Sequence, residues 1–124
     1  MYSFSFERFE VWQLSRVLVK ELYNKLKNFP KKEQYVLTNQ LQRAIISVVS
    51  NIAEGSSRSS LKDQIRFIEM AYGSLMEVYA QLCIAVDLSY IGNSEFDIFT
   101  IKIKEISNKP NALRNSHIKR LENK

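Results

Sequence analysis

Residues 40–60, QLQRAIISVVSNIAEGSSRSS, form the stretch of sequence that decides the fold. In this region apolar residues recur at about 100° per residue, as on an α-helix, and make one narrow stripe: Leu37, Leu41, Ala44, Ile45, Val48 and Ile52. A second apolar stripe lies almost opposite the first and consists of Tyr35, Ile46, Val49 and Ala53. The helix is expected to end at Gly55, where a C-cap glycine would stand before the run of serines.

Two apolar stripes on one helix predict burial on two sides. A helix of a monomeric four-helix bundle needs only one apolar face, and a domain of 124 residues is too small to surround a helix by itself. We therefore expect one stripe to face the core of the subunit and the second to face another copy of the chain. Phe67 and Met70, in the next helical segment, add apolar area on a further side and join the second stripe as interface candidates. The pattern predicts a homo-oligomer.

A polar wedge separates the two stripes and contains Gln40, Arg43, Ser47, Ser50, Asn51 and Glu54. In one interpretation it is a hydrogen-bonded network at a helix or subunit seam, where Arg43 pairs with a carboxylate and Asn51 satisfies neighbouring polar groups. In the other interpretation Arg43 and its neighbours form a ligand-binding surface. The first is favoured, because polar residues beside an interface usually fix its register.

The whole chain is expected to be all-α, an up-down-up-down four-helix bundle in one domain over residues 1–109. Short connections at residues 28–32, 54–60 and 90–95 are typical of such bundles. Pro110 is expected to end the last helix, which leaves residues 110–124 as a short basic segment. The predicted helices cover residues 5–29, 33–54, 60–90 and 94–109.

The third helix has a recognisable start and an unusual middle. Ser60 and Asp63 make a capping box at its beginning. In its middle, Gly73 and Ser74 are small enough to admit a neighbouring helix, and Gly73 costs about 1 kcal/mol of helix propensity relative to alanine. The preceding loop is interpreted either as a solvated linker or as a phosphate site, in which Arg58, Lys62 and free amides at the helix start would bind the anion.

Composition and charge set the class of protein. A single cysteine excludes an internal disulfide, and the chain has no secretory or membrane-spanning stretch, so we expect a cytoplasmic protein. The net charge is +5, yet residues 59–90 carry −2 while every other segment is basic. Such a molecule suits a polyanion partner as well as another copy of itself. On the first helix, Arg16, Lys20 and Lys27 are nucleic-acid-binding candidates.

No catalytic, metal or cofactor site is predicted. Cys83 lies in the apolar stripe of the third helix, where it packs rather than reacts. His117 is the only histidine and lies in the basic segment after Pro110, so no Cys–His pair and no site with several histidines is expected within one subunit. Residues 59–62, SSLK, match a serine-acylase pattern by letter but lack its companion motifs. We therefore predict that the protein is not an enzyme.

Several motifs resemble the bacterial family of 23S rRNA-intervening sequence proteins. The pattern begins with F-P-x-x-E at residues 29–33, runs through L-x-x-Q-x-x-R-A and S-x-x-x-N-I-A-E-G at residues 37–55, and ends with G-S-L-x-E at residues 73–77. Residues 9–15, FEVWQLS, are similar to the opening helix of the family. Eight positions are taken as the structural signature: Gln40, Arg43, Ser47, Asn51, Glu54, Gly55, Gly73 and Glu77.

The resemblance implies a four-helix bundle that assembles into a homo-oligomeric ring, and the expected ring is a pentamer. It also implies a link to RNA, since some family members are encoded within insertions in large ribosomal RNA genes. Relatives include accessory proteins of diversity-generating retroelements, which bind nucleic acid and a reverse transcriptase. The predicted function is non-catalytic binding of structured RNA or DNA through summed phosphate contacts. The alternative is an adaptor for a protein partner such as a reverse transcriptase.

Overall fold

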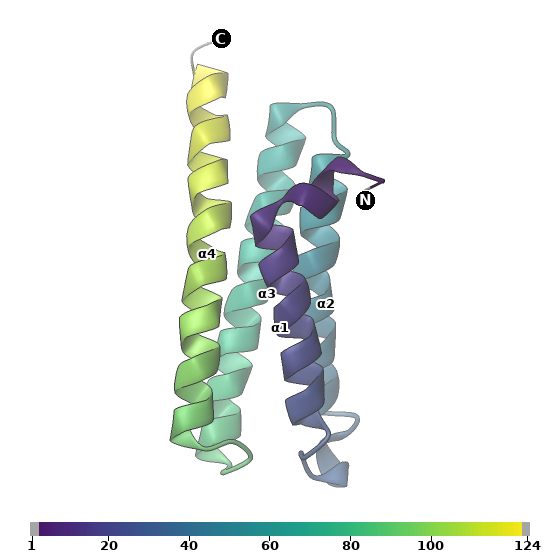
Figure 1. Ribbon diagram of the computed structural model, residues 1–124, viewed down its shortest axis with the longest axis vertical. Helices are drawn as coiled ribbons and strands as arrows, with labels where there is room; N and C mark the ends of the chain where they lie inside the picture. Colours follow the sequence, from purple (N-terminus) through teal and green to yellow (C-terminus); the bar gives the residue numbers. More distant parts are fainter. Residues whose placement is uncertain (1–2, 123–124) are drawn as a thin grey trace.

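The computed structural model shows an all-α protein with four long helices, as predicted (Figure 1). The structure describes residues 3–122, and for residues 109–121 it describes the backbone alone. No strand occurs in the described part of the chain. In chain order the elements are η1 (Ser5–Arg8), α1 (Glu10–Leu26), η2 (Lys31–Glu33), α2 (Leu37–Ser56), α3 (Leu61–Asp87) and α4 (Asn93–Glu122).

The four helices alternate in direction, which gives the predicted up-down-up-down bundle (Figure 1). The main partners of α3 are α2 and α4, and α1 closes the bundle by packing on both α2 and α4. The connections between α1 and α2 and between α3 and α4 lie at one end, and the beginning of the chain and the end of α4 lie at the other.

Each long helix contributes a stripe of fully buried aliphatic side chains to one core. The largest of these side chains are Leu18, Leu22, Leu41, Ile45, Leu75, Leu82, Ile103 and Ile106. On α2 the buried residues Leu41, Ala44, Ile45, Val48 and Ile52 belong to the stripe that the sequence predicts, and the first member of that stripe, Leu37, is half-buried. Burying each large aliphatic side chain stabilises the fold by about 1.5–3 kcal/mol. The core therefore fixes which side of every helix faces outward.

The first two helices are shorter than predicted, because the chain bends at their starts. Residues 5–8 form a 3-10 turn, and Phe9 is extended at φ −70° and ψ 124° before α1 begins. Pro30 is also extended, and a second 3-10 turn follows it before α2. Proline fixes φ near −65° and cannot continue the ladder of a preceding helix, which explains the break at this end.

The last helix is longer than predicted. It was expected to end at about residue 109, but α4 continues through Pro110 to Glu122. A proline removes one backbone hydrogen bond, and the bonds on either side of it maintain the helix when nothing else ends it. No glycine follows Pro110, so the sequence offers no glycine C-cap at which the helix would stop. In Figure 1 the tip of α4 lies slightly beyond the beginning of α3.

Candidate nucleic-acid interface

The polar wedge of α2 forms a hydrogen-bonded seam with α3. Asn51 is buried, and its Nδ2 donates to the Ser47 carbonyl at 2.8 Å and to Ser47 Oγ at 2.9 Å. Ser47 Oγ in turn lies 2.8 Å from Ser74 Oγ of α3. This chain of contacts gives the polar side chain at position 74 a partner across the seam, as buried polar groups require. The seam shows that this flank of α2 faces α3.

A groove of about 340 Å³ opens outward from this seam, and its lining includes Gln40, Arg43 and Glu77. Arg43 and Glu77 are both exposed, and neither forms an ion pair with another described residue. The structure thus places opposite charges from α2 and α3 along one groove without joining them. Ser47 and Ser74 line the same groove.

The structure therefore brings most signature positions together from two distant parts of the sequence. Five of them lie along the α2–α3 seam or line its groove: Gln40, Arg43, Ser47, Asn51 and Glu77. Gly55 was predicted to end α2, but α2 continues to Ser56, and Gly55 is buried against Phe67 of α3. Gly73 is exposed on α3, and among the described side chains none lies within 4 Å of the position that its Cβ would take.

Arg58, predicted to bind phosphate, is held within the subunit. Its Nη2 lies 2.6 Å from Glu54 Oε1, and its guanidinium lies 4.7 Å from the centre of the Phe67 ring. Ser60 does cap α3, since its side chain accepts a hydrogen bond from the Asp63 amide at 3.1 Å. Lys62 remains exposed. The predicted phosphate site in this loop thus retains one exposed cation, while Arg58 stabilises the end of α2.

The outer face of α1 carries the other predicted cations. Arg16, Lys20 and Lys27 are spaced by four and seven residues, so they form one line on the side opposite the buried Leu18 and Leu22. All three cations are exposed, and the Arg16 guanidinium lies 5.4 Å from the centre of the Trp12 ring. We call these three residues the α1 basic line.

The carboxylates of α1 lie away from the basic line. Glu21 accepts a hydrogen bond from Lys102 of α4, so this flank of α1 faces α4. Glu10 stands eleven residues earlier, three helical turns along the same flank. A second pair joins α1 to α4, with Lys25 Nζ 2.8 Å from Glu95 Oε2. This contact, together with the Gly92 amide, lowers the pKa of the Glu95 carboxyl.

Two lysines outside the predicted set, Lys31 and Lys32, extend the positive charge at the end of α1. Lys31 and Lys32 are exposed in η2, only a few residues beyond Lys27. The neighbouring Glu33 is turned inward, where its Oε2 accepts a hydrogen bond from Tyr90 Oη at 2.7 Å. This contact raises the pKa of Tyr90, because the phenol donates to a carboxylate. The adjacent letters KK after Pro30 were the signal available in the sequence.

The predicted interface residues in and just before α2 divide into exposed and half-buried ones. Tyr35 and Ile46 are exposed, whereas Val49 and Ala53 are half-buried. Met70 of α3 is exposed as well. Phe67, by contrast, is only 5% exposed, because it packs over Gly55 and beneath Arg58. Phe67 therefore belongs to the interior of the subunit and offers no outer surface.

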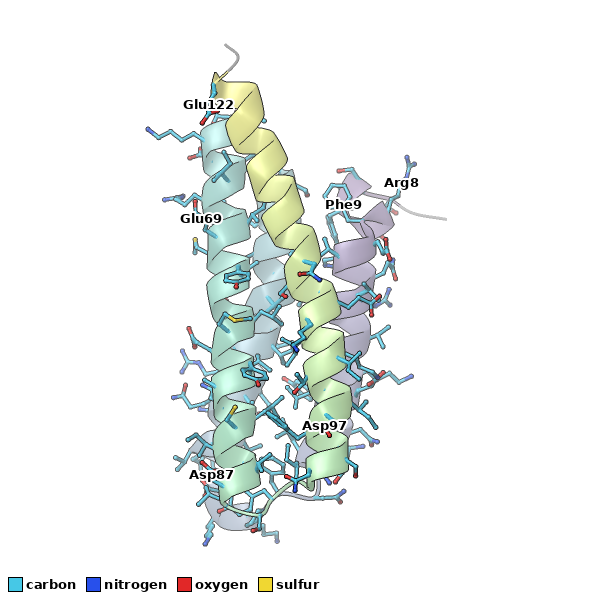
Figure 2. All side chains as sticks on the ribbon, turned by 90° about the vertical axis from the view of Figure 1, so that its left-hand side faces the viewer. Arg8, Phe9, Glu69, Asp87, Asp97 and Glu122 are labelled. Atoms are coloured by element: carbon cyan, nitrogen blue, oxygen red, sulfur yellow. The ribbon has the colours of Figure 1, made fainter. Side chains whose placement is uncertain are left out.

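Within the described residues no helix has the length and apolar character needed to cross a membrane. The same residues contain no cluster of three or more histidine, cysteine, aspartate or glutamate side chains arranged to hold a metal ion. Figure 2 shows all the described side chains on the bundle, in a view turned by 90° from that of Figure 1.

The sequence matches one protein family over most of its length. The model of the 23S rRNA-intervening sequence protein family matches residues 7–112. The chain belongs to this family. The match includes all four helices of the bundle and ends shortly after Pro110 in α4. No curated protein matches the sequence.

A solved structure with the same fold supports the architecture. It is a protein of unknown function from the S23 ribosomal protein family of Bacteroides thetaiotaomicron VPI-5482. The TM-score is 0.78 at 20% sequence identity, and the match covers 85% of the present chain and 95% of the other. At 20% identity this similarity concerns the fold alone, and it supports the four-helix fold of the present chain.

Proposed function

We propose that this 23S rRNA-intervening sequence protein binds structured RNA or DNA through the α1 basic line and does so without catalysis. The observation that carries the proposal is the arrangement of charge on α1. Arg16, Lys20 and Lys27 share the outward face, while Glu10 and Glu21 lie on the flank toward α4. Such an array of cations suits a phosphate backbone and provides electrostatic affinity with little base specificity.

Self-association would strengthen this binding. Of the predicted second stripe, Ile46 of α2 and Tyr35, in the turn before α2, are exposed, and contact with another copy of the chain would bury such residues. In a closed homo-oligomeric ring, with a pentamer as the expected form, each subunit would present its own basic line. Several weak phosphate contacts then act on one nucleic acid molecule, which raises the overall affinity.

The test is binding of the purified protein to a labelled RNA hairpin, measured by fluorescence anisotropy across a series of salt concentrations. We expect the logarithm of affinity to fall steeply with the logarithm of salt concentration, because phosphate contacts release counterions. Replacing Lys20 and Lys27 together by alanine should weaken binding and reduce the salt slope by about two. The matched control is Lys104→Ala, which removes an exposed lysine from α4.

The loop site gives a second comparison in the same experiment. Lys62→Ala should have a smaller effect than the double change in α1, because Lys62 stands alone beside an engaged Arg58. Absence of binding by the wild-type protein at low salt would contradict the proposed function. Equal losses in the α1 variant and in Lys104→Ala would contradict the proposed surface.

The alternative function is that of an adaptor for a protein partner such as a reverse transcriptase. The observation in its favour is an apolar patch on the outer side of α4, where Ile98 and Ile101 are 54% and 66% exposed. Side chains of this kind anchor protein interfaces when a partner covers them. The adaptor function predicts that Ile98→Ser with Ile101→Ser abolishes capture of the enzyme, whereas the α1 lysine variant does not.

A further inference from the structure

We infer that two copies of this chain associate through the outer side of α4, related to each other by a two-fold axis. The contact surface consists of Asp97, Ile98, Ile101 and Lys104, which we call the α4 patch. This contact goes beyond the proposed function, because the α1 basic line and the second apolar stripe of α2 include none of these residues. Figure 2 looks onto the side of the bundle that α4 forms, where Asp97 is labelled.

The four residues of the α4 patch share one exposed face of a single helix. Ile98 and Ile101, at 54% and 66% exposure, are the most exposed large apolar side chains on the described parts of the four long helices. Asp97 and Lys104 are also exposed. They stand seven residues apart, which is about two turns of helix, so they lie along one line about 10 Å from each other. The isoleucines come between them in the sequence.

The charged side chains of α4 are paired on one side of the helix and unpaired on the other. Glu95 and Lys102 each form an ion pair with a residue of α1 inside the subunit. Asp97 and Lys104, on the outer side, form no ion pair with another described residue. The subunit therefore leaves one negative and one positive charge at the two ends of an exposed apolar pair.

A second copy of the chain, turned by half a turn, complements this arrangement. A two-fold axis that crosses α4 near Ile101 makes the two α4 helices antiparallel, and a contact of this kind uses the same patch on both copies. Asp97 of each copy then stands opposite Lys104 of the other, which gives two ion pairs. The Ile101 side chains of the two copies meet at the axis and bury apolar surface. Opposite charges fix the register of such a contact.

A nucleic acid and a ring contact fit the α4 patch less well. The patch carries no net charge, so it does not attract a polyanion. A ring contact is head-to-tail and brings a patch against a different surface of the next subunit, so the order of charges within one patch need not complement itself. In the described residues α4 packs on α1 and α3 and not on α2. The patch thus lies away from the second stripe of α2, and a two-fold contact can form beside a ring.

The first experiment measures molar mass by light scattering over a series of protein concentrations. Ile101→Ser is expected to halve the mass of the wild type, because a two-fold contact joins two identical units, whether each unit is one subunit or one ring. The matched control is Ile84→Ser, which changes an isoleucine of α3 that is 49% exposed and should keep the wild-type mass. Asp97→Lys and Lys104→Asp should each weaken the association by about tenfold, and the two changes together should restore it.

The second experiment tests the symmetry of the contact with a single cysteine. A residue beside a two-fold axis meets its own copy, so Ile101→Cys should form a disulfide-linked dimer on mild oxidation, in a protein whose native thiol is removed by Cys83→Ala. In a head-to-tail contact residue 101 meets a different residue, and no such link can form. Ile84→Cys in the same background is the control and should stay unlinked.

Each other outcome overturns the inference in a recognisable way. Equal masses of the wild type and Ile101→Ser would leave the α4 patch to another protein, as in the adaptor function. A fall from a ring of more than two subunits to single subunits would make the patch the ring contact. Failure of the double charge reversal to restore association would exclude the pairing of Asp97 with Lys104. Circular dichroism verifies that each variant is folded, and RNA binding has no part in these results.

Discussion

Gly55 of α2 lies directly against Phe67 of α3, so closely that a Cβ atom on residue 55 would stand 2.8 Å from the Cβ of Phe67. The contact holds the end of α2 close to the beginning of α3. Because the Phe67 Cβ is attached to the backbone, it cannot move aside as the tip of a flexible side chain would.

Gly55→Ala is therefore expected to destabilise the fold. Overpacking costs about 1–3 kcal/mol, and the better helix propensity of alanine returns at most about 1 kcal/mol. The measurement is the free energy of unfolding in urea. Gly73→Ala is the matched control, since no other described group lies within 4 Å of its new Cβ, and it should stabilise the helix by about 0.5–1 kcal/mol. Equal effects of the two changes would show that the Phe67 contact is unimportant.

Ser89 ends α3 in the left-handed conformation, at φ 63°. The Tyr90 amide donates to the Ala85 carbonyl and the Ser89 amide to the Val86 carbonyl, the pair of bonds that defines a Schellman cap. Glycine adopts this conformation without strain, so Ser89→Gly should raise the free energy of unfolding by about 0.5–1 kcal/mol. Ser50→Gly, within α2, should lower it by about 0.5 kcal/mol. Thermal unfolding of both variants checks the opposite signs.

Alanine substitutions at Asn51 and Ser74, in the Asn51–Ser47–Ser74 seam, are expected to lower the free energy of unfolding by unequal amounts. Asn51→Ala removes both donations to Ser47 from a buried site and should cost about 1–3 kcal/mol. Ser74→Ala should cost less, because Ser47 Oγ still accepts from Asn51. A double-mutant cycle in urea unfolding measures the coupling between positions 51 and 74. A coupling of zero would show that the hydrogen bonds act independently and do not form a network.

The Lys25–Glu95 pair predicts a particular loss of stability in acid. Hydrogen bonds from Lys25 and Gly92 lower the pKa of Glu95 from its ordinary value of 4.5, so the folded state favours the ionised carboxylate. The contribution is present above pH 4.5 and is lost as the pH falls through the lower pKa of the folded state. Glu95→Gln should therefore flatten the dependence of unfolding free energy on pH in this range.

The control for this pH dependence is Glu105→Gln, which removes a carboxylate from the exposed side of the same helix. We expect it to leave the acid branch of the curve close to that of the wild type, whereas Glu95→Gln changes its slope. If both variants follow the wild-type curve, the contact with Lys25 has no part in acid stability.

Local sequence determined the number of helices, the side of α2 that is buried and the cap that begins α3. Helical periodicity places Leu41, Ile45 and Val48 on one face wherever the helix packs, and Ser60 caps α3 through the amide of Asp63 in the first turn of its own helix. These features depend on residues within a few positions of one another, so the bare sequence contains the needed information.

The tertiary structure decided what depends on contacts between distant segments. Gly55 was predicted as a cap, but its place against Phe67 follows from the packing of α2 on α3. Arg58 was predicted as a phosphate-binding candidate, yet the Phe67 ring of α3, together with Glu54 four residues earlier, holds it. The extension of α4 through Pro110 is different, because there the local expectation was wrong: a proline weakens a helix without always ending it.

The α1 basic line was likewise predicted in part from the sequence and in part only from the structure. The sequence by itself identified the line Arg16, Lys20 and Lys27, because spacings of four and seven residues share one face of a helix. Only the folded chain showed that Glu21 turns toward Lys102 and that Glu33 turns toward Tyr90, which leaves the lysines of this surface uncompensated. The physical reason is that the face on which a helical residue lies depends only on its neighbours in sequence. The ion-pair or hydrogen-bond partner of a charged side chain depends on which other segment packs beside it.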